Sequence, residues 1–385
     1  NPAEPDWPKV DFIVGNPPFL GGSKLWNELG RDYQERLWQQ YKNRVPGAAD
    51  LCCYWFEKAR AHIATGKCKR AGLLATQSIR GGTNREVLKR IKESGDIFWA
   101  VSDQDWILDG ATVHVSMIAF DNGEEKTRTL DDKKVSTINA NLTAAADVTQ
   151  AKTISSNLGV CFIGTKKAGQ FNLPEEAVIP WLSLPNPHGK PNSDVLRPWT
   201  NGTTLMQKGL PQWIIDAGVD MPLEEFQRYE QPFLFVIENV KPERDTNKEE
   251  RTRSNFWLHK RPGPDMRAAL LSIARCIAVV RHSKHRLFTW LDTSVLPDDG
   301  IYVFARADDW FLGVLHSRIH DVWAMSQGTQ VRERDSGFRY TPQTCFETFP
   351  FPETHTEHDA AITAAAKELN DLRERWLNPP EWTRE

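Results

Sequence analysis

The sequence predicts an α/β domain, then a mixed α+β domain, and finally a helical segment. Residues 9–120 alternate short apolar runs with amphipathic runs of helical length, which is typical of a mostly parallel sheet covered by helices. From about residue 121 this alternation stops, and Pro, Asn, Gly and Ser separate short β-like runs. An alanine-rich stretch at residues 358–377 predicts one further helix. We therefore expect domains at residues 1–125, 126–352 and 353–385.

The first domain contains a strand, two helices, a strand, a helix and two strands in chain order. Asp50 stands where the second helix would be capped, and Gly66 stands where it would end. The first strand is short and apolar, so we expect it to be buried. The expected ranges are a strand at 9–15, helices at 26–45 and 49–66, a strand at 69–79, a helix at 81–95, and strands at 96–103 and 111–121.

Composition sets the limits on function. The 385 residues have a net charge of −3, so the molecule as a whole shows no strong preference for nucleic acid. Its six cysteines form no CxxC pair, which favours free thiols in a reducing compartment over disulfides or a zinc site. The sequence shows no signal peptide and no apolar run of transmembrane length. We expect a cytoplasmic protein with no membrane partner and no bound metal.

The stretch DFIVGNPPF at residues 11–19 raises a chemical question, because an apolar strand leads directly into Asn-Pro-Pro-Phe. Prolines end the strand, and an Asn at the carboxyl end of a strand lies where open α/β sheets bind ligands. The Asn16 side-chain oxygen and the Pro17 carbonyl form a rigid pair of acceptors for an –NH2 group. Phe19 offers a flat face for a planar ring that carries this amine. Hydrogen bonds from both N–H groups to these acceptors favour a pyramidal nitrogen. The lone pair of that nitrogen attacks an electrophilic methyl group.

A second copy of the tripeptide serves as an internal control. Asn378-Pro379-Pro380 lies in a polar tail and is followed by Glu381. No apolar strand precedes this copy and no aromatic residue directly follows it. We interpret the second copy as a simple turn, and only the first as a functional site.

The first copy and its surroundings resemble a known family. VDFIVGNPPF is similar to motif IV of the gamma-type amino-group DNA methyltransferases, which use S-adenosylmethionine. Further segments resemble the MmeI-like (type IIL) restriction–modification enzymes, which join adenine-N6 methylation and target recognition in one polypeptide. These segments are RVPGAADLCCYWFEKARAHI, KRAGLLATQSIRGGTNREVLKRI, WILDGATVHVSMIAFD, VKPERD, SKHRLFTWL, WFLGVLHSRIHDVWA and RYTPQTCFETFPFP.

The resemblance implies a partial doubly wound, Rossmann-like methyltransferase sheet, followed by a target-recognition domain and the helical tail. It implies that Asn16, Pro17, Pro18 and Phe19 form the catalytic motif, with Phe19 stacking on an adenine flipped out of double-stranded DNA. Related enzymes carry a second stacking aromatic before the strand matching VHVSMIAF. Trp106 is the nearest aromatic here, whereas the aligned position is Leu108.

The family also has a glycine-rich cofactor turn, and no such turn precedes residue 11. We therefore expect this chain to be the C-terminal piece of a longer enzyme, with the missing N-terminal part as its partner and an incomplete pocket for S-adenosylmethionine. Asp50 is the candidate to line that pocket, with capping of a helix as the alternative. Glu124-Glu125-Lys126 has the form of a nuclease element, but we interpret it as a solvated hairpin.

Two basic stretches are candidates for reading DNA. We assign the first to phosphates, because cations without matching base partners mostly contact the backbone. We assign the second to bases, because Arg, Gln and Glu pair with guanine, adenine and cytosine respectively. The first comprises Arg281, Lys284 and Arg286, and the second comprises Gln327, Gln330, Arg332, Glu333, Arg334 and Arg339.

Two alternatives to DNA adenine methylation remain open on the sequence. Asn-Pro-Pro-aromatic also serves methyltransferases of protein glutamine or of RNA amines, although small protein methylases lack a long second domain. The chain is alternatively a DNA-specificity module without turnover, because the cofactor turn is missing. Binding of the cofactor distinguishes this last alternative from the enzyme.

Overall fold

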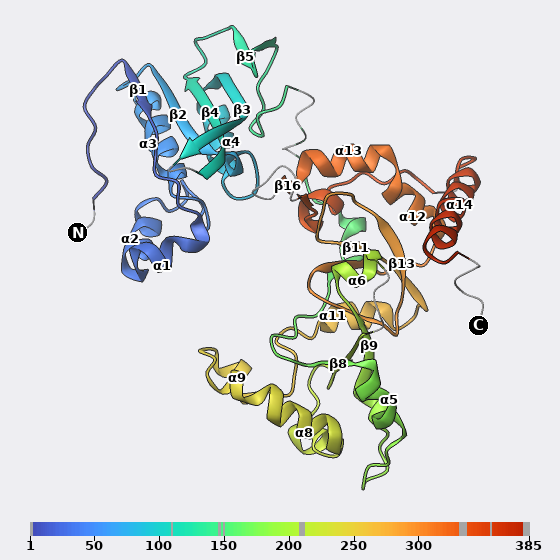
Figure 1. Ribbon diagram of the computed structural model, residues 1–385. Helices are drawn as coiled ribbons and strands as arrows, with labels where there is room; N and C mark the ends of the chain where they lie inside the picture. The colour runs from blue at the N-terminus through green and yellow to red at the C-terminus, as the bar shows by residue number, and fades with distance from the viewer. Residues whose placement is uncertain are drawn as a thin grey trace. The chain divides into compact units, whose positions relative to one another are not determined.

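The computed structural model describes residues 3–108, 111–144, 148, 151–207, 212–330, 337–354 and 356–379. The chain forms two compact units (Figure 1). Unit 1 comprises Asn1–Lys152 and Met325–Phe338, and unit 2 comprises Thr153–Ala324 and Arg339–Glu385. Across the described residues, no helix combines the length and the apolar character that crossing a membrane requires.

Unit 1 is built on one six-stranded sheet with the strand order β1-β2-β4-β3-β5-β6. The helix expected at 26–45 is two helices, because Gly30 between them has a φ of 86° and breaks the helical path. The elements are β1 (Phe12–Gly15), α1 (Leu25–Leu29), α2 (Arg31–Gln40), α3 (Cys52–Ala64), β2 (Arg70–Thr76), α4 (Arg85–Ser94), β3 (Asp96–Leu108), β4 (Ala111–Asp121), β5 (Arg128–Leu130) and β6 (Lys133–Val135).

This sheet is mixed, so the expectation of a mostly parallel sheet is wrong. β1 and β2 pair in parallel, with Phe12 opposite Arg70. β4 runs antiparallel to both of its neighbours, β2 and β3. The reason is the short connection from β3 to β4, since only an antiparallel strand can follow so few residues. The partial α/β fold expected for this domain is otherwise confirmed.

Helices α3 and α4 pack against each other and against the sheet. Phe56 of α3 stacks on Phe120 of β4 with ring centroids 6.1 Å apart. Along β4, Ile118 and Phe120 are buried whereas Met117 and Ala119 are half-buried, as expected where helices cover one face of a sheet. Figure 1 shows α3 near β2 and α4 near β3, the strands that they contact.

Strand β1 was expected to be buried, and this expectation is wrong. Phe12 is 64% exposed and Val14 is 85% exposed. The physical reason is that β1 lies at the edge of the sheet, where the described residues provide β2 as its one neighbouring strand. An edge strand with two exposed apolar side chains presents a free hydrogen-bonding edge and an apolar face together.

Unit 2 contains two four-stranded sheets, in the orders β14-β9-β10-β8 and β13-β11-β15-β7. All pairings in these sheets are antiparallel except the parallel pair of β14 and β9. α13 and β17 contain residues of both units. The strands are β7 (Cys161–Ile163), β8 (Asn172–Pro174), β9 (Leu196–Thr200), β10 (Gln212–Ile215), β11 (Arg275–Val280), β12 (His282–Ser283), β13 (Phe288–Asp292), β14 (Leu296–Pro297), β15 (Ile301–Phe304), β16 (Thr329–Gln330, in the unit 1 segment) and β17 (Phe338–Arg339).

Helices surround these sheets, and the predicted mixed α+β domain with a helical tail is confirmed. The tail helix α14 packs on α12 at Gly313, where a β-carbon would lie 2.8 Å from the Ile362 side chain and 3.2 Å from that of Ala366. Only glycine allows this close approach. The helices are α5 (Glu175–Ser183), α6 (Gly202–Gln207), α7 (Leu223–Phe226), α8 (Glu230–Asn239), α9 (Lys241–Asp245), α10 (Glu250–Ser254), α11 (Pro264–Leu270), α12 (Asp309–His316), α13 (Arg318–Gln327) and α14 (Asp359–Leu377).

Candidate functional site

The Asn-Pro-Pro-Phe segment leaves the sheet at the carboxyl end of β1. Gly15 is the last residue of the strand, opposite Leu73 of β2. Asn16 is exposed, Pro17 is buried and Phe19 is half-buried. The amide of Asn16 is therefore open to solvent, next to a proline that is fixed against the protein and lacks an N–H group. The role of the Asn16 side-chain oxygen and the Pro17 carbonyl as acceptors for an amine stays a prediction.

Asp50 lies beside the end of this segment. Its Oδ1 accepts a hydrogen bond of 2.9 Å from the Gly22 backbone N–H, and its Oδ2 accepts bonds of 2.7 Å from Ser78 and from Asn84. Helix α3 starts at Cys52, and no side chain caps its first turn. The expectation that Asp50 caps this helix is therefore wrong, because its carboxylate faces the loop after β1.

Trp106 lies near the end of β3, opposite Val113 of β4, and is 37% exposed. β2 ends with Thr76 opposite Val115, so Trp106 belongs to the part of the β3–β4 hairpin that extends beyond β2. The strand order separates β3 from β1 by two strands. Trp106 as the second stacking residue stays a prediction, and the side chain of Leu108 lies outside the described residues.

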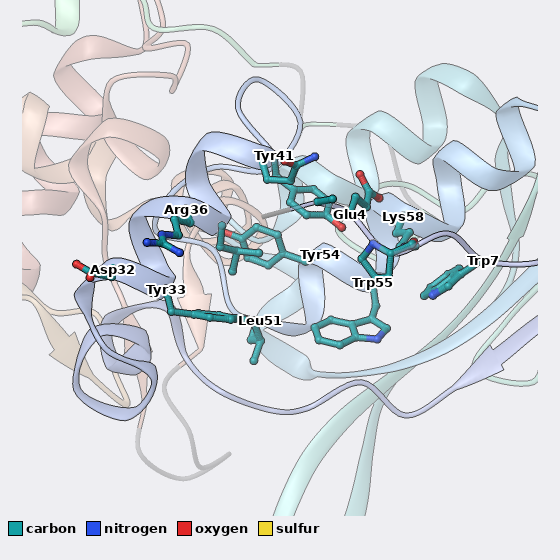
Figure 2. A pocket seen from close by; sticks show the side chains of 14 residues that line it. Glu4, Trp7, Asp32, Tyr33, Arg36, Tyr41, Leu51, Tyr54, Trp55 and Lys58 are labelled. Atoms are coloured by element: carbon teal, nitrogen blue, oxygen red, sulfur yellow. The ribbon is translucent and has the colours of Figure 1, made fainter. Parts of the chain in front are cut away.

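Unit 1 also contains an aromatic cavity of about 520 Å³ that the sequence reasoning missed (Figure 2). Figure 2 shows Tyr33 and Trp55 on either side of Leu51. The rings of Tyr41 and Tyr54 meet edge to face, 5.0 Å apart. The cavity adjoins the motif loop, because the backbone N–H of Leu51 donates to the carbonyl of Leu20 over 2.8 Å. One signal was visible in the sequence: Leu51, Tyr54, Trp55 and Lys58 share one helical face.

The polar groups of this cavity are poorly solvated. The Tyr54 hydroxyl is buried without a hydrogen-bond partner of good geometry among the described residues, and burial raises the pKa of Tyr54 to about 12. Burial also lowers the pKa of Lys58, whose ammonium lies 4.7 Å from the centre of the Trp7 ring and contacts the Pro5 carbonyl. The cavity thus joins aromatic faces to the buried Tyr54 hydroxyl.

In unit 2, the structure brings two of the predicted DNA-binding arginines close together. The Arg281 carbonyl accepts from the Tyr340 N–H over 3.0 Å, which places Arg281 beside Arg339. The Nε atoms of both arginines are buried without a hydrogen-bond partner among the described residues. Burial lowers the pKa of the adjacent His282, and the charges of both arginines lower it further. The region is electropositive.

Other predicted DNA-binding residues differ in their availability. Lys284 is exposed. Arg286 forms an ion pair with Asp321, and its side chain is only 9% exposed. Gln327 is 5% exposed and donates to the Val148 carbonyl. Arg332, Glu333 and Arg334 lie outside the described residues, as does the side chain of Gln330.

The Glu124-Glu125-Lys126 stretch and the possible metal ligands can be placed in the described ranges. No group of three or more His, Cys, Asp or Glu residues there is arranged to hold a metal ion. Lys126 of the Glu124-Glu125-Lys126 stretch donates to the carbonyl of Gly123, and Glu125 pairs with Arg70. The stretch is thus a turn after β4 held by its own contacts.

Fold and site together define a class of protein: a DNA methyltransferase domain joined to a target-recognition domain. Two family models match the chain in this order. Residues 3–131 match "MmeI, DNA-methyltransferase domain", and residues 193–353 match "MmeI, target recognition domain". The chain therefore belongs to the MmeI-like family of type IIL restriction–modification enzymes, as the sequence resemblance predicted.

Individual relatives agree with this assignment. A structure of the type IIL restriction–modification enzyme MmeI in complex with DNA has the same fold, with a TM-score of 0.75 and 21% identity. The match covers 96% of this chain and 50% of that chain, so this chain spans about half the length of its relative. DNA methyltransferase A of Bacillus subtilis (strain 168) is 36% identical over 74 residues, which are 19% of this chain and 8% of the relative.

Proposed function

We propose that the protein transfers a methyl group from S-adenosylmethionine to N6 of adenine within a specific DNA sequence. In this proposal the chain supplies the catalytic motif and the target-recognition domain. One observation carries it: Asn16, Pro17, Pro18 and Phe19 leave the carboxyl end of β1 in a domain of the MmeI methyltransferase family. Open α/β sheets bind their ligands at this end of their strands.

The proposed chemistry uses two acceptors on one amine. The Asn16 side-chain oxygen and the Pro17 carbonyl each accept a hydrogen bond from one of the two N6–H groups. These bonds favour a nitrogen with a localised lone pair. Phe19 stacks on the adenine ring, which must leave the duplex because its amine is unreachable inside the helix. These contacts strengthen as the nitrogen becomes pyramidal and gains positive charge, so they stabilise the transition state more than the bound base.

The aromatic cavity is our proposed site for the purine ring of S-adenosylmethionine. Aromatic walls suit a planar ring, the buried Tyr54 hydroxyl offers it a hydrogen bond, and Leu51 links the cavity to the motif loop. Bound there, the cofactor would supply an electrophilic methyl group. Asp50 was the sequence candidate for this role, but both of its carboxylate oxygens already accept hydrogen bonds from the protein.

The free edge of β1 supports a second partner besides DNA. The exposed Phe12 and Val14 lie on a strand whose outer edge is unpaired in the sheet. We assign this edge to the N-terminal part of the same enzyme, which would add a strand and complete the cofactor site. Such strand addition joins main-chain hydrogen bonds to apolar contacts.

The electropositive region of unit 2 is assigned to DNA. Arg281 and Arg339 lie together without a carboxylate partner in the residues that the structure covers, and Lys284 is exposed nearby in the sequence. These cations suit phosphates, whose contacts position a protein on DNA. Base reading by Arg332 and Arg334 remains a prediction.

The decisive experiment is product analysis. The longest natural form of the protein is incubated with isotopically labelled S-adenosylmethionine and randomised duplex DNA, and the nucleosides are separated after digestion. We expect label in N6-methyladenine and a single sequence context around the modified sites. Label on cytosine, on RNA or on protein would contradict the proposal.

A further inference from the structure

The loop that carries the catalytic motif is attached to residues 48–51 of unit 1. The Leu51 N–H donates to the Leu20 carbonyl over 2.8 Å. Gly22 packs so closely that a β-carbon there would lie 2.2 Å from the Ala48 carbonyl oxygen and 2.8 Å from that of Ala49. Position 22 therefore requires glycine, because the loop packs directly on the backbone of this segment.

Asp50 lies at the centre of this attachment. Its Oδ1 accepts the Gly22 backbone N–H, while its Oδ2 accepts the Ser78 hydroxyl and the Asn84 amide. The Asp50 backbone N–H in turn donates to Asn84 Oδ1 over 2.8 Å. The Asn84 amide group therefore binds both the backbone and the carboxylate of Asp50. Bonds to an ionised acceptor are stronger than neutral ones.

Three segments that are distant in sequence thus meet at one carboxylate. They are the loop after β1, the segment before α3, and the segment between β2 and α4, which contributes Ser78 and Asn84. Asn84 is 7% exposed and anchors the cluster in the body of the domain, whereas Asp50 is half-buried and Ser78 is exposed. The stiff Pro17-Pro18 pair carries any displacement of the loop end back to Phe19 and Asn16.

We propose that Asp50, held by Asn84 and Ser78, is the positioning residue that fixes the catalytic loop at the end of the sheet. The proposal rests on the proposed function. In the proposed function, Asp50 does not contact the adenine N6 amine, because its two carboxylate oxygens accept hydrogen bonds from protein donors. Its effect passes through Gly22, and a displacement of about 1 Å at the reacting groups costs a rate factor on the order of 100.

The test uses an exchange of the two side chains. Asp50→Asn replaces one acceptor oxygen by an amide that faces the donors of Ser78 and Asn84. The double variant Asp50→Asn with Asn84→Asp restores complementary pairs, because the new Asn donates to the new Asp while Gly22 keeps an acceptor. Asp131→Asn is the matched control, since Asp131 also accepts a backbone N–H and a hydroxyl, both from Ser102 of β3.

Two readouts are taken on the longest natural form of the protein. Hydrogen exchange followed by mass spectrometry measures how firmly residues 16–24 are held. Single-turnover methylation of DNA measures the chemical step, and the equilibrium affinity for DNA is measured in parallel. We expect Asp50→Asn to speed exchange in residues 16–24 and to slow methylation about 10- to 100-fold at unchanged DNA affinity. We expect the double variant to recover most of the exchange protection of residues 16–24 and most of the methylation rate. We expect Asp131→Asn to change neither the exchange nor the rate.

Each other outcome counts against the inference in an identifiable way. Unchanged exchange in Asp50→Asn would show that Asp50 does not hold the loop, whether or not the protein methylates DNA. Faster exchange with unchanged methylation would show that loop position does not limit the reaction. Failure of the double variant to recover would assign the loss to something other than these hydrogen bonds. A wild-type protein without methylation activity would overturn the proposed function, while the exchange data still decide whether Asp50 anchors the loop.

Discussion

Two polar clusters, one from each unit, differ in how they meet solvent. In unit 2, Arg244 is 1% exposed, and its guanidinium donates only to backbone carbonyls. These belong to Lys167, Ala168, Thr252 and Leu258. Asp216, which is 3% exposed, accepts two bonds of 2.9 Å from Arg267. In unit 1, the cluster around Asp50 holds the loop after β1 at Gly22, and Asn16 at the start of that loop is exposed. The buried charged side chains of Arg244 and Asp216 stabilise the fold. The polar groups after the end of β1 are open to solvent and can contact a ligand.

The largest effect should come from the open site. Asn16→Ala removes one of two proposed acceptors, so we expect methyl transfer to fall by a factor on the order of 1,000. Specific DNA binding should change little. Stability should change by less than about 0.5 kcal/mol, because the side chain is exposed. Single-turnover methylation, DNA affinity and urea unfolding measure the three quantities. Methylation within a few-fold of wild type would remove Asn16 from the mechanism.

The sealed arginine should show the opposite pattern. Arg244→Met keeps much of the side-chain length but removes the guanidinium donor from four carbonyl groups, of which that of Lys167 also accepts the Lys260 N–H. We expect a loss in the free energy of unfolding of roughly 3 kcal/mol, since each buried unsatisfied group costs about 1–3 kcal/mol and relaxation recovers part of it. Urea unfolding measures this loss.

Arg261→Met is the control for this variant, because Arg261 is half-exposed and pairs with Asp299 at the surface. We expect it to have a much smaller effect. Equal losses for the two variants would show that the burial of Arg244 is energetically unimportant.

The next effect concerns pH and again distinguishes unit 2. Burial lowers the pKa of His320 to about 4, while its Nδ1 bonds the Leu315 carbonyl and its Nε2 bonds the Tyr340 hydroxyl. Burial likewise lowers the pKa of His259 and His316. An unfolded histidine takes up its proton near pH 6.5, whereas folded His320 does so only near pH 4. The stabilising contribution is therefore complete above about pH 6.5 and is lost as the pH falls toward 4.

From pH 7 to pH 5 we expect His320 alone to cost roughly 2 kcal/mol of unfolding free energy. Urea titrations at the two pH values measure this difference. His320→Gln should be less stable at pH 7 but should lose less between the two values. His188→Gln, at an exposed position, should behave like wild type. An unchanged pH dependence in His320→Gln would assign the acid sensitivity to other groups.

Sequence reasoning succeeded where the information was local. The alternation of apolar and amphipathic runs predicted the α/β domain, and the catalytic role of the consecutive residues Asn16 to Phe19 stays a prediction. The partners of Asp50 were out of reach because Gly22, Ser78 and Asn84 come from separate segments.

The exposure of β1 and the pairing of Arg286 could not be predicted either, for related reasons. The former depends on the order of strands in space. The latter depends on a carboxylate 35 residues away. An apolar run of four residues has the same sequence pattern at the centre of a sheet and at its edge.

A smaller effect separates two cations that the sequence treated alike. Lys284 is exposed, whereas Arg286 is nearly buried and paired with Asp321. We expect Lys284→Ala to weaken DNA binding on all sequences by a similar few-fold and to reduce the salt dependence by about one phosphate contact. Fluorescence anisotropy at several salt concentrations measures both. Arg286→Ala should act mainly on stability. A change of recognition sequence in Lys284→Ala would contradict a role at the backbone.

The smallest effect should come from the second Asn-Pro-Pro. Asn378 directly follows α14, and its amide donates to the Glu374 carboxylate over 3.0 Å. Asn378 follows the end of a helix, whereas Asn16 follows the carboxyl end of the parallel strand β1. We expect Asn378→Ala to leave methyl transfer unchanged and to cost a few tenths of a kcal/mol at most, because a solvated side-chain bond contributes little. The same single-turnover and urea measurements apply. If Asn378→Ala slowed methylation as Asn16→Ala does, structural context would no longer distinguish the two copies, and the assignment of the catalytic role to residues 16–19 would lose its main support.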